Sequence, residues 1–160
     1  MKVNMSNIIF ILDVDGVMTT GQFIYSELGK LYKIFGAHDS DGLKLINKSV
    51  NIKFITADKR GYSITRKRIV EDMGYELKLV SECDRFEYLQ KKYNMENLIY
   101  MGDGYFDANI LKKCMFGIAP KNARKEAKDC ADFITESKSG EGAVLDACIE
   151  IKKRYIDYEC

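Results

Sequence analysis

Short apolar runs alternate with longer amphipathic segments along most of this chain, and the alternation limits the folds available to it. The first run, Ile8–Leu12, contains no polar residue, as expected for a strand that is buried on both faces. Mostly apolar runs follow at 52–55 and 77–80, each with one lysine, and at 98–101 and 115–119. Strands that alternate with helices predict an α/β, Rossmann-like fold with a mostly parallel central sheet and helices on both faces.

The amphipathic segments between these runs are the expected helices. They lie at 41–49, 63–73, 84–93, 107–113, 122–129 and from about 142 to 155. Asp41 and Ser63 are the expected N-caps of the first two helices, because their side-chain oxygens can accept hydrogen bonds from free backbone N–H groups.

The segment at about 22–35 departs from this alternation and is typical of a β-hairpin. Two arms rich in aromatic and β-branched residues, Phe23–Ser26 and Leu31–Phe35, flank a turn that contains Gly29. Because the hairpin follows the first strand, we expect it to project as a flap from the carboxyl edge of the sheet. Its aromatic side chains are expected to pack within the hairpin or at an interface: Tyr25, Tyr32 and Phe35.

Composition narrows the class of protein further. A length of 160 residues predicts a single domain over 1–160, and a formal net charge of +1 gives no strong field for binding nucleic acid or a membrane surface. The five cysteines are widely spaced without a C-x-x-C pair, which favours reduced thiols in a cytoplasmic protein over disulfides or a zinc site. The apolar stretches are too short for a membrane helix or a signal peptide, including the one that follows Met1–Asn7.

Polar side chains follow three of the predicted strands at the point where each strand ends. Asp13 and Asp15 follow the first strand, Thr56 ends the second, and Asp103 follows the run at 98–101, with Asp107 four residues later. Ligands of open parallel sheets bind outside the carboxyl ends of the strands, so we expect these groups to meet there. Carboxylates suit Mg²⁺, which often shares its oxygen ligands with a substrate phosphate. A carboxylate can also attack phosphorus and form an aspartyl-phosphate.

The Asp-x-Asp-Gly spacing allows its two acids to take different chemical roles. One acid can act as the nucleophile while the other handles protons, and Gly16 permits a tight turn close to the phosphate. A calcium loop is the alternative, but it needs a Glu at its twelfth position, which is Ile24 here. Taken alone, the segment 102–104 is equally typical of a turn. The combination of all three strand ends indicates phosphoryl chemistry.

With these motifs the chain resembles the haloacid dehalogenase superfamily of phosphotransferases, and within it the capless sugar-acid phosphatases. The resemblance covers about 8–151. It is carried by Asp13-Val14-Asp15-Gly16-Val17-Met18-Thr19, the hairpin, Asp39-Ser40-Asp41-Gly42-Leu43-Lys44, Phe54-Ile55-Thr56, Tyr100-Met101-Gly102-Asp103, Ala131-Asp132-Phe133-Ile134-Thr135 and Gly140-Glu141-Gly142-Ala143-Val144.

The resemblance implies a Mg²⁺-dependent phosphatase and gives the strand-end residues roles. It implies that Asp13 is the nucleophile and that Asp15 is the general acid/base. Thr56 is implied to hydrogen-bond the phosphoryl oxygens, and the backbone carbonyl of Val14 to face the metal site. The implied metal ligands are Asp13, Asp15, Asp103 and Asp107.

The chain departs from the family pattern at several charged positions. Arg85 stands where the family has a catalytic lysine, and Asp58 stands where close relatives have an arginine, with Lys78 a weaker candidate for the lysine role. Gly104 and Glu141 replace an acid and an arginine of the relatives. Cations that could supply the charge lost at Asp58 are Arg60, Arg66 and Arg68. The substrate-binding residues implied by the resemblance are His38, Asp39, Lys44, Ala57 and Arg66.

The implied substrate is a small phosphate monoester, such as 3-deoxy-D-manno-octulosonate 8-phosphate or an acylneuraminate 9-phosphate. Only 29 positions separate Thr56 from Arg85, which leaves no room for a cap domain. The resemblance therefore implies a homo-oligomer, a tetramer, in which the hairpin of one chain covers the site of its neighbour. The alternative is that the chain is a weakly active or inactive relative that serves as a phosphate-binding or regulatory protein.

Overall fold

A six-stranded, fully parallel sheet forms the centre of the computed structural model, which describes residues 7–157. Residues 1–6 and Cys160, which enter the expectations about a signal peptide and about cysteines, lie outside this range. The order of the strands is β5-β4-β1-β6-β7-β8, with β1 at the centre between β4 and β6. Their bounds are β1 Ile9–Asp13, β4 Asn51–Thr56, β5 Glu76–Leu79, β6 Leu98–Met101, β7 Phe116–Ala119 and β8 Phe133–Ile134. The predicted α/β fold is confirmed, although the two-residue β8 was not expected as a strand.

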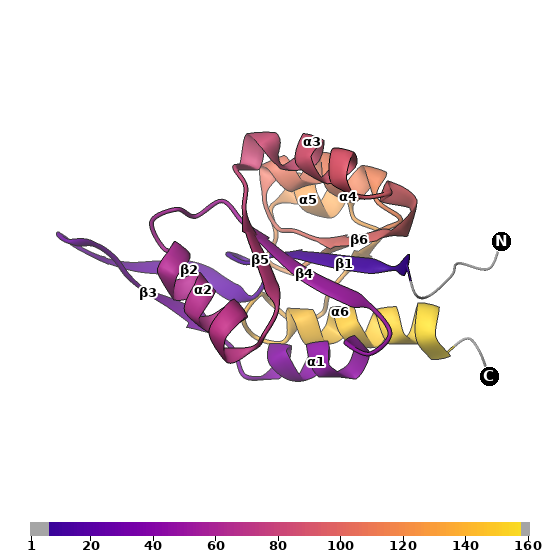
Figure 1. The fold of residues 1–160 in the computed structure, drawn as a ribbon, viewed down its shortest axis with the longest axis horizontal. Coiled ribbons are helices and arrows are strands. Elements are labelled where there is room, and N and C mark those ends of the chain that lie inside the picture. Colours follow the sequence, from indigo (N-terminus) through magenta and orange to yellow (C-terminus); the bar gives the residue numbers. More distant parts are fainter. Residues whose placement is uncertain (1–6, 158–160) are drawn as a thin grey trace.

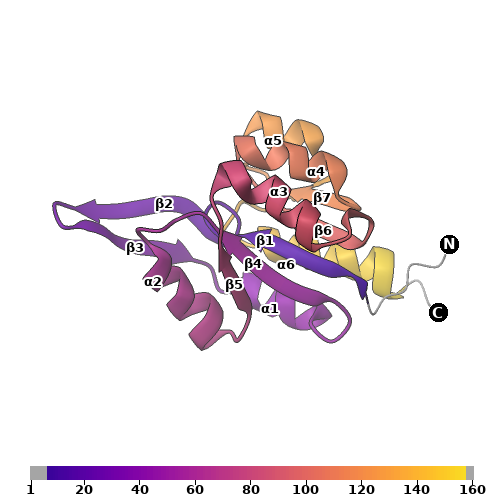
Figure 2. The ribbon, with the colours of Figure 1, turned by 45° about the horizontal axis from the view of Figure 1, so that its top comes forward.

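Helices cover both faces of this sheet, as Figures 1 and 2 show. Helices α1 (His38–Ile46) and α6 (Ala143–Ile151) pack together on one face. The opposite face carries α3 (Glu82–Lys92), α4 (Ala108–Lys113) and α5 (Lys125–Cys130). Each face has its own apolar cluster, so the central strands β1, β6 and β7 are buried on both sides, whereas the edge strands β5 and β8 are largely exposed.

Two predicted helix starts are wrong. Helix α1 begins three residues before Asp41, which lies inside the helix and bonds Lys44 instead of capping. An early start suits the packing, because the buried carboxylate of Asp39 accepts a hydrogen bond from Val144 N in α6. Helix α2 (Tyr62–Arg66) follows Gly61, so Ser63 is not its N-cap either. After α2 and after α6 the chain continues in wider π-helical turns, at Lys67–Asp72 and Lys152–Ile156.

The expected hairpin is present and projects from the carboxyl edge of the sheet (Figure 1). Its strands are β2 (Thr19–Ser26) and β3 (Gly29–Phe35), so the first arm begins earlier than the sequence suggests. No cap domain interrupts the fold between residues 7 and 157. Among the described helices none is long and apolar enough to cross a membrane.

Candidate active site

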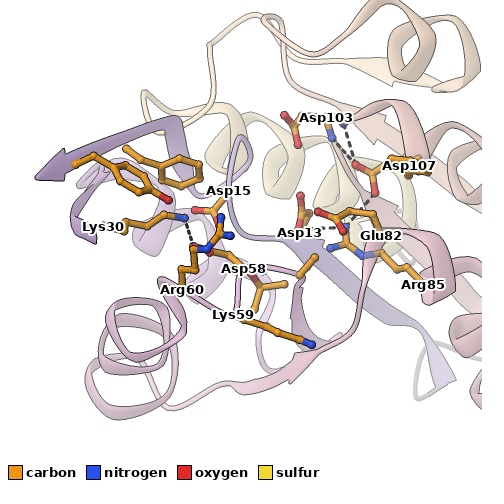
Figure 3. A pocket seen from close by; sticks show the side chains of 16 residues that line it. Asp13, Asp15, Lys30, Asp58, Lys59, Arg60, Glu82, Arg85, Asp103 and Asp107 are labelled. Carbon is orange, nitrogen blue, oxygen red and sulfur yellow. Dashed lines mark hydrogen bonds and ion pairs between the residues drawn. The ribbon is translucent and has the colours of Figure 1, made fainter. Parts of the chain in front are cut away.

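A pocket of about 620 Å³ opens at the carboxyl edge of the sheet, beside the hairpin. Figure 3 shows that its side chains come from the end of β1, the hairpin, the loop after β4, the start of α3 and the loop after β6. Its polar and charged side chains are those of Asp13, Asp15, Lys30, Thr56, Asp58, Lys59, Arg60, Glu82, Arg85, Asp103 and Asp107. The three strand ends singled out in the sequence therefore meet in one pocket, as predicted.

Three carboxylates form the floor of this pocket. One oxygen each of Asp13, Asp103 and Asp107 lies within 4.8 Å of the other two. The close approach follows from the topology, because β1 and β6 are neighbours and end side by side. Gly16 is required here, since its φ is +85° and a Cβ at this position would lie 2.1 Å from Asp103 Oδ2.

Burial and mutual repulsion disfavour negative charge on all three carboxylates at once. Burial raises the pKa of Asp13 well above its usual range, and the carboxylates of Asp107 and Asp103 add to the rise against the opposing charge of Arg85. Burial, followed by the charge of Asp107, raises the pKa of Asp103 to about 7. A divalent cation would relieve this repulsion, and an all-oxygen donor set fits a hard ion such as Mg²⁺.

Arg85 provides the one cation that touches this cluster within the described chain. Its Nη1 lies 3.1 Å from Asp13 Oδ1 and donates hydrogen bonds of 3.2 Å to Asp107 Oδ1 and to the hydroxyl of Tyr100. Burial opposes its charge, but Asp13, Tyr100 and Asp107 outweigh burial and raise the pKa of Arg85. The Tyr100 hydroxyl in turn donates to Asp107 Oδ1 at 2.6 Å. The sequence gives no sign of this role for Tyr100, because the residue lies within an apolar strand.

Asp15 lies in the pocket, but its carboxylate is not part of the three-carboxylate cluster. Instead Asp15 Oδ2 accepts a hydrogen bond of 2.8 Å from Lys33 Nζ. The expectation that the Val14 carbonyl faces a metal is wrong, because this oxygen accepts three turn hydrogen bonds, the shortest from Met18 N at 2.8 Å. Thr56 is the last residue of β4 and lines the pocket, and its Oγ1 accepts a hydrogen bond from Asp58 N.

Two hairpin lysines that the sequence did not single out pair with Asp58. Lys30 Nζ lies 2.5 Å and Lys33 Nζ 2.8 Å from Asp58 Oδ2. Burial opposes ionisation of Asp58, but hydrogen bonds from both lysines lower its pKa to about 2. A regular strand would turn positions 30 and 33 to opposite faces. Here the pairing register shifts, since Ile24 opposes Tyr32 whereas Tyr25 opposes Lys30, and this bulge allows both lysines to reach Asp58.

Four predicted substrate-binding residues do not line the pocket of this chain, whereas Ala57 does. Asp39 is buried and caps α6 through Val144 N. Lys44 pairs with Asp41 on the surface of α1, and Arg66 pairs with Glu71. His38 is exposed at the start of α1. Tyr25, which was expected to pack in the hairpin or at an interface, lines the pocket together with Phe23.

Similarity to known proteins agrees with this site. A 3-deoxy-D-manno-octulosonate 8-phosphate phosphatase from Haemophilus influenzae is 31% identical over 149 residues, which cover 89% of this chain and 82% of that protein. The chain belongs to the haloacid dehalogenase-like hydrolases. The model of the family with that description matches residues 84–147. The phosphatase of the same name from Escherichia coli K12 is 28% identical over 152 residues, covering 88% of this chain and 76% of that protein.

Solved structures of this hydrolase family share the fold. A probable phosphatase from Pseudomonas syringae superposes with a TM-score of 0.84 at 28% identity, covering 96% of this chain and 90% of its own. The 3-deoxy-D-manno-octulosonate 8-phosphate phosphatase of Moraxella catarrhalis superposes with a TM-score of 0.78 at 27% identity, covering 92% and 87%; that structure holds magnesium, phosphate and the sugar acid. The chain is therefore a phosphoric monoester hydrolase, which favours the enzyme over the inactive phosphate-binding relative.

Proposed function

We propose that this hydrolase cleaves a small sugar or sugar-acid phosphate with Mg²⁺ as its cofactor, through an aspartyl-phosphate on Asp13, and that residues 1–160 form a single phosphatase domain. The observation that carries the proposal is the convergence of three carboxylates and one buried arginine on the pocket floor. A protein that only binds phosphate has no need to collect repelling carboxylates where its anionic ligand would lie.

Asp13, Asp103 and Asp107 are the residues that would hold Mg²⁺. Their oxygens form a cluster of suitable chemistry, and their repulsion disfavours the metal-free state. When bound, the ion supplies positive charge that neutralises phosphate oxygens and lowers their repulsion toward a carboxylate nucleophile.

The residues of the chain divide the reaction into two displacements. In the first, an oxygen of Asp13 attacks phosphorus, the bond from phosphorus to the ester oxygen breaks, and Asp15 gives its proton to the departing alcohol. In the second, Asp15 takes a proton from water, the water oxygen bonds to phosphorus, and phosphate leaves as the Asp13 carboxylate is restored. Arg85 at the floor and the hydroxyl of Thr56 at the strand end are positioned to bind phosphoryl oxygens.

The rest of the pocket supports a polar, anionic substrate. Lys59 and Arg60 line its rim, and neither forms an ion pair within the described part of the chain. Two relatives and one similar structure are phosphatases of 3-deoxy-D-manno-octulosonate 8-phosphate, which carries a carboxylate besides its phosphate. We propose this ester or an acylneuraminate 9-phosphate as the substrate, with Arg60 and Lys59 near the carboxylate.

A panel of phosphate esters tests this function. Purified protein is incubated with Mg²⁺ and sugar phosphates, sugar-acid phosphates and nucleotides, and released phosphate is measured with and without EDTA. We expect EDTA-sensitive hydrolysis with the highest kcat/KM on a sugar-acid phosphate. Hydrolysis that is insensitive to EDTA would count against the metal, and a preference for nucleotides would count against the substrate class.

We also propose that the chain self-associates through its hairpin in the cytoplasm. Several apolar side chains of the hairpin are more than two-fifths exposed: Ile24, Tyr25, Leu28, Leu31, Tyr32 and Ile34. An apolar surface of this kind on a projecting element is typical of an interface. A neighbouring hairpin would complete the cover over a pocket that this chain alone leaves open.

A further inference from the structure

The most deeply buried charge of the hairpin belongs to Lys33, for which the proposed chemistry has no role. Its side chain is 0% exposed. Its Nζ lies 2.8 Å from Asp15 Oδ2, 2.8 Å from Asp58 Oδ2 and 2.7 Å from Thr65 Oγ1. The ammonium group therefore donates hydrogen bonds to Asp15 and Thr65 and forms an ion pair with Asp58, so three acceptors surround its three hydrogens.

The two carboxylates depend on Lys33 to different degrees. Asp58 has a second cation at 2.5 Å, the ammonium of Lys30. Within residues 7–157, Lys33 is the one cation paired with Asp15. The other carboxylate oxygen, Asp15 Oδ1, accepts a long hydrogen bond of 3.4 Å from the hydroxyl of Thr19 and no other from the described side chains. The orientation of the Asp15 carboxylate is therefore set mainly by Lys33.

Lys33 joins three segments that are far apart in the sequence. It extends from β3 of the hairpin to Asp15 in the loop after β1, and to Thr65 in α2. A buried lysine is costly unless every hydrogen bond is made, so this contact holds the hairpin and Asp15 in one fixed relation.

We propose that Lys33 is a positioning residue that holds the Asp15 carboxylate in the orientation from which its proton reaches the leaving oxygen. This inference rests on the proposed function, in which Asp15 is the general acid. The competing explanation is that Lys33 only fastens the hairpin to the domain. The two explanations differ in how the effect of removing Lys33 depends on the leaving group.

The test compares kcat/KM for two esters with the Lys33→Met variant, because kcat/KM reports the first displacement, in which the leaving group departs, and not the later hydrolysis that both esters share. The 4-nitrophenolate ion leaves without a proton, whereas the alcohol of a sugar phosphate needs one. If Lys33 positions Asp15, kcat/KM should fall by about 10²-fold on the sugar phosphate and by less than about fivefold on 4-nitrophenyl phosphate. The matched control is Lys53→Met, which removes a lysine that is paired with Glu76 and does not line the pocket, and it should leave the ratio of the two kcat/KM values unchanged.

A double-mutant comparison separates positioning from fastening. Asp15→Asn should show the same leaving-group selectivity, and adding Lys33→Met to it should cost little more on the sugar phosphate, because both changes remove one function. Equal losses on both esters, or losses that multiply in the double variant, would overturn the inference. Lys33→Gln, which keeps a polar head in the buried site, should give the same selectivity and serves if Lys33→Met does not fold.

The same data distinguish this inference from the proposed function. If Asp15→Asn is selective for the sugar phosphate but neither Lys33 variant is, the role of Lys33 fails and the function stands. If Asp15→Asn shows no selectivity, Asp15 is not the general acid, and both the inference and that part of the mechanism fail.

Discussion

Nη1 of Arg85 lies 3.1 Å from Oδ1 of Asp13, so a permanent positive charge touches the carboxylate that is the proposed nucleophile. Arg85 is 3% exposed, and it reaches this position from the first turn of α3. The family resemblance implies a lysine at this position. The fixed planar head of Arg85 can bind Asp13 and Asp107 and still direct N–H groups at a phosphate.

Replacing Arg85 by methionine should therefore damage both activity and stability. Loss of the cation leaves Asp13 and Asp107 buried without it, which should cost roughly 3–5 kcal/mol of unfolding free energy in the absence of metal. We expect kcat to fall by at least about 10²-fold in saturating Mg²⁺, because charge stabilisation at phosphorus is lost. Thermal denaturation and 4-nitrophenyl phosphate hydrolysis measure the two effects. Arg154→Met, which removes a surface arginine paired with Glu150, should change neither by much.

The metal-free protein should lose stability as the pH rises from about 4 to about 7. The folded-state pKa of Asp103 is raised to about 7 from 3.8, so over this range the folded state binds more protons than the unfolded state. Each such group lowers stability by up to about 1.4 kcal/mol per pH unit. Mg²⁺ should remove this loss, and its affinity should fall below pH 7 as protons compete. Thermal melts with EDTA and with Mg²⁺ between pH 5 and pH 8 measure both effects; a metal-free melting temperature that rises over this range would contradict the account.

Replacing Asp58 by asparagine should shift the substrate preference toward more anionic esters. The carboxylate of Asp58 neutralises Lys30 and Lys33 beside the pocket, so its removal leaves a stronger positive potential there. We expect KM to fall severalfold for a phosphate ester that carries an extra carboxylate, compared with the phosphate ester of an uncharged sugar. Lys30→Met should shift the ratio of the two KM values in the opposite direction. Equal KM changes for both esters would contradict this account.

A charge at the tip of the hairpin should weaken the proposed self-association. Leu28 is 90% exposed, and a lysine there would be buried against a neighbour only at a high cost. Light scattering should show oligomers for the natural protein and a smaller species for Leu28→Lys. Leu45→Lys, on α1 and 48% exposed, is the matched control and should keep the natural size. A monomeric natural protein would remove the proposal that a neighbour covers the site.

The sequence predicts the sheet and the catalytic strand ends well, because both depend on local patterns. Continuous apolar runs identify β1, β4 and β6, and the polar residues that follow them must meet at one edge of a parallel sheet. Side chains that bind across distant segments could not be predicted in the same way. Lys30 and Lys33 both reach Asp58 because the hairpin contains a bulge, and no residue pattern in its two strands predicts that bulge. Asp39 resembles a cleft residue in sequence but is used to cap a helix more than 100 residues away.

The rate of 4-nitrophenyl phosphate hydrolysis by Asp13→Asn in saturating Mg²⁺ tests the central claim most directly. Asparagine keeps the shape of the side chain but cannot act as the attacking carboxylate. If Asp13 accepts the phosphoryl group, the variant should fold, as judged by its thermal melt, and lose at least about 10³-fold in kcat. A folded variant that retains more than about a tenth of the natural rate would contradict the account.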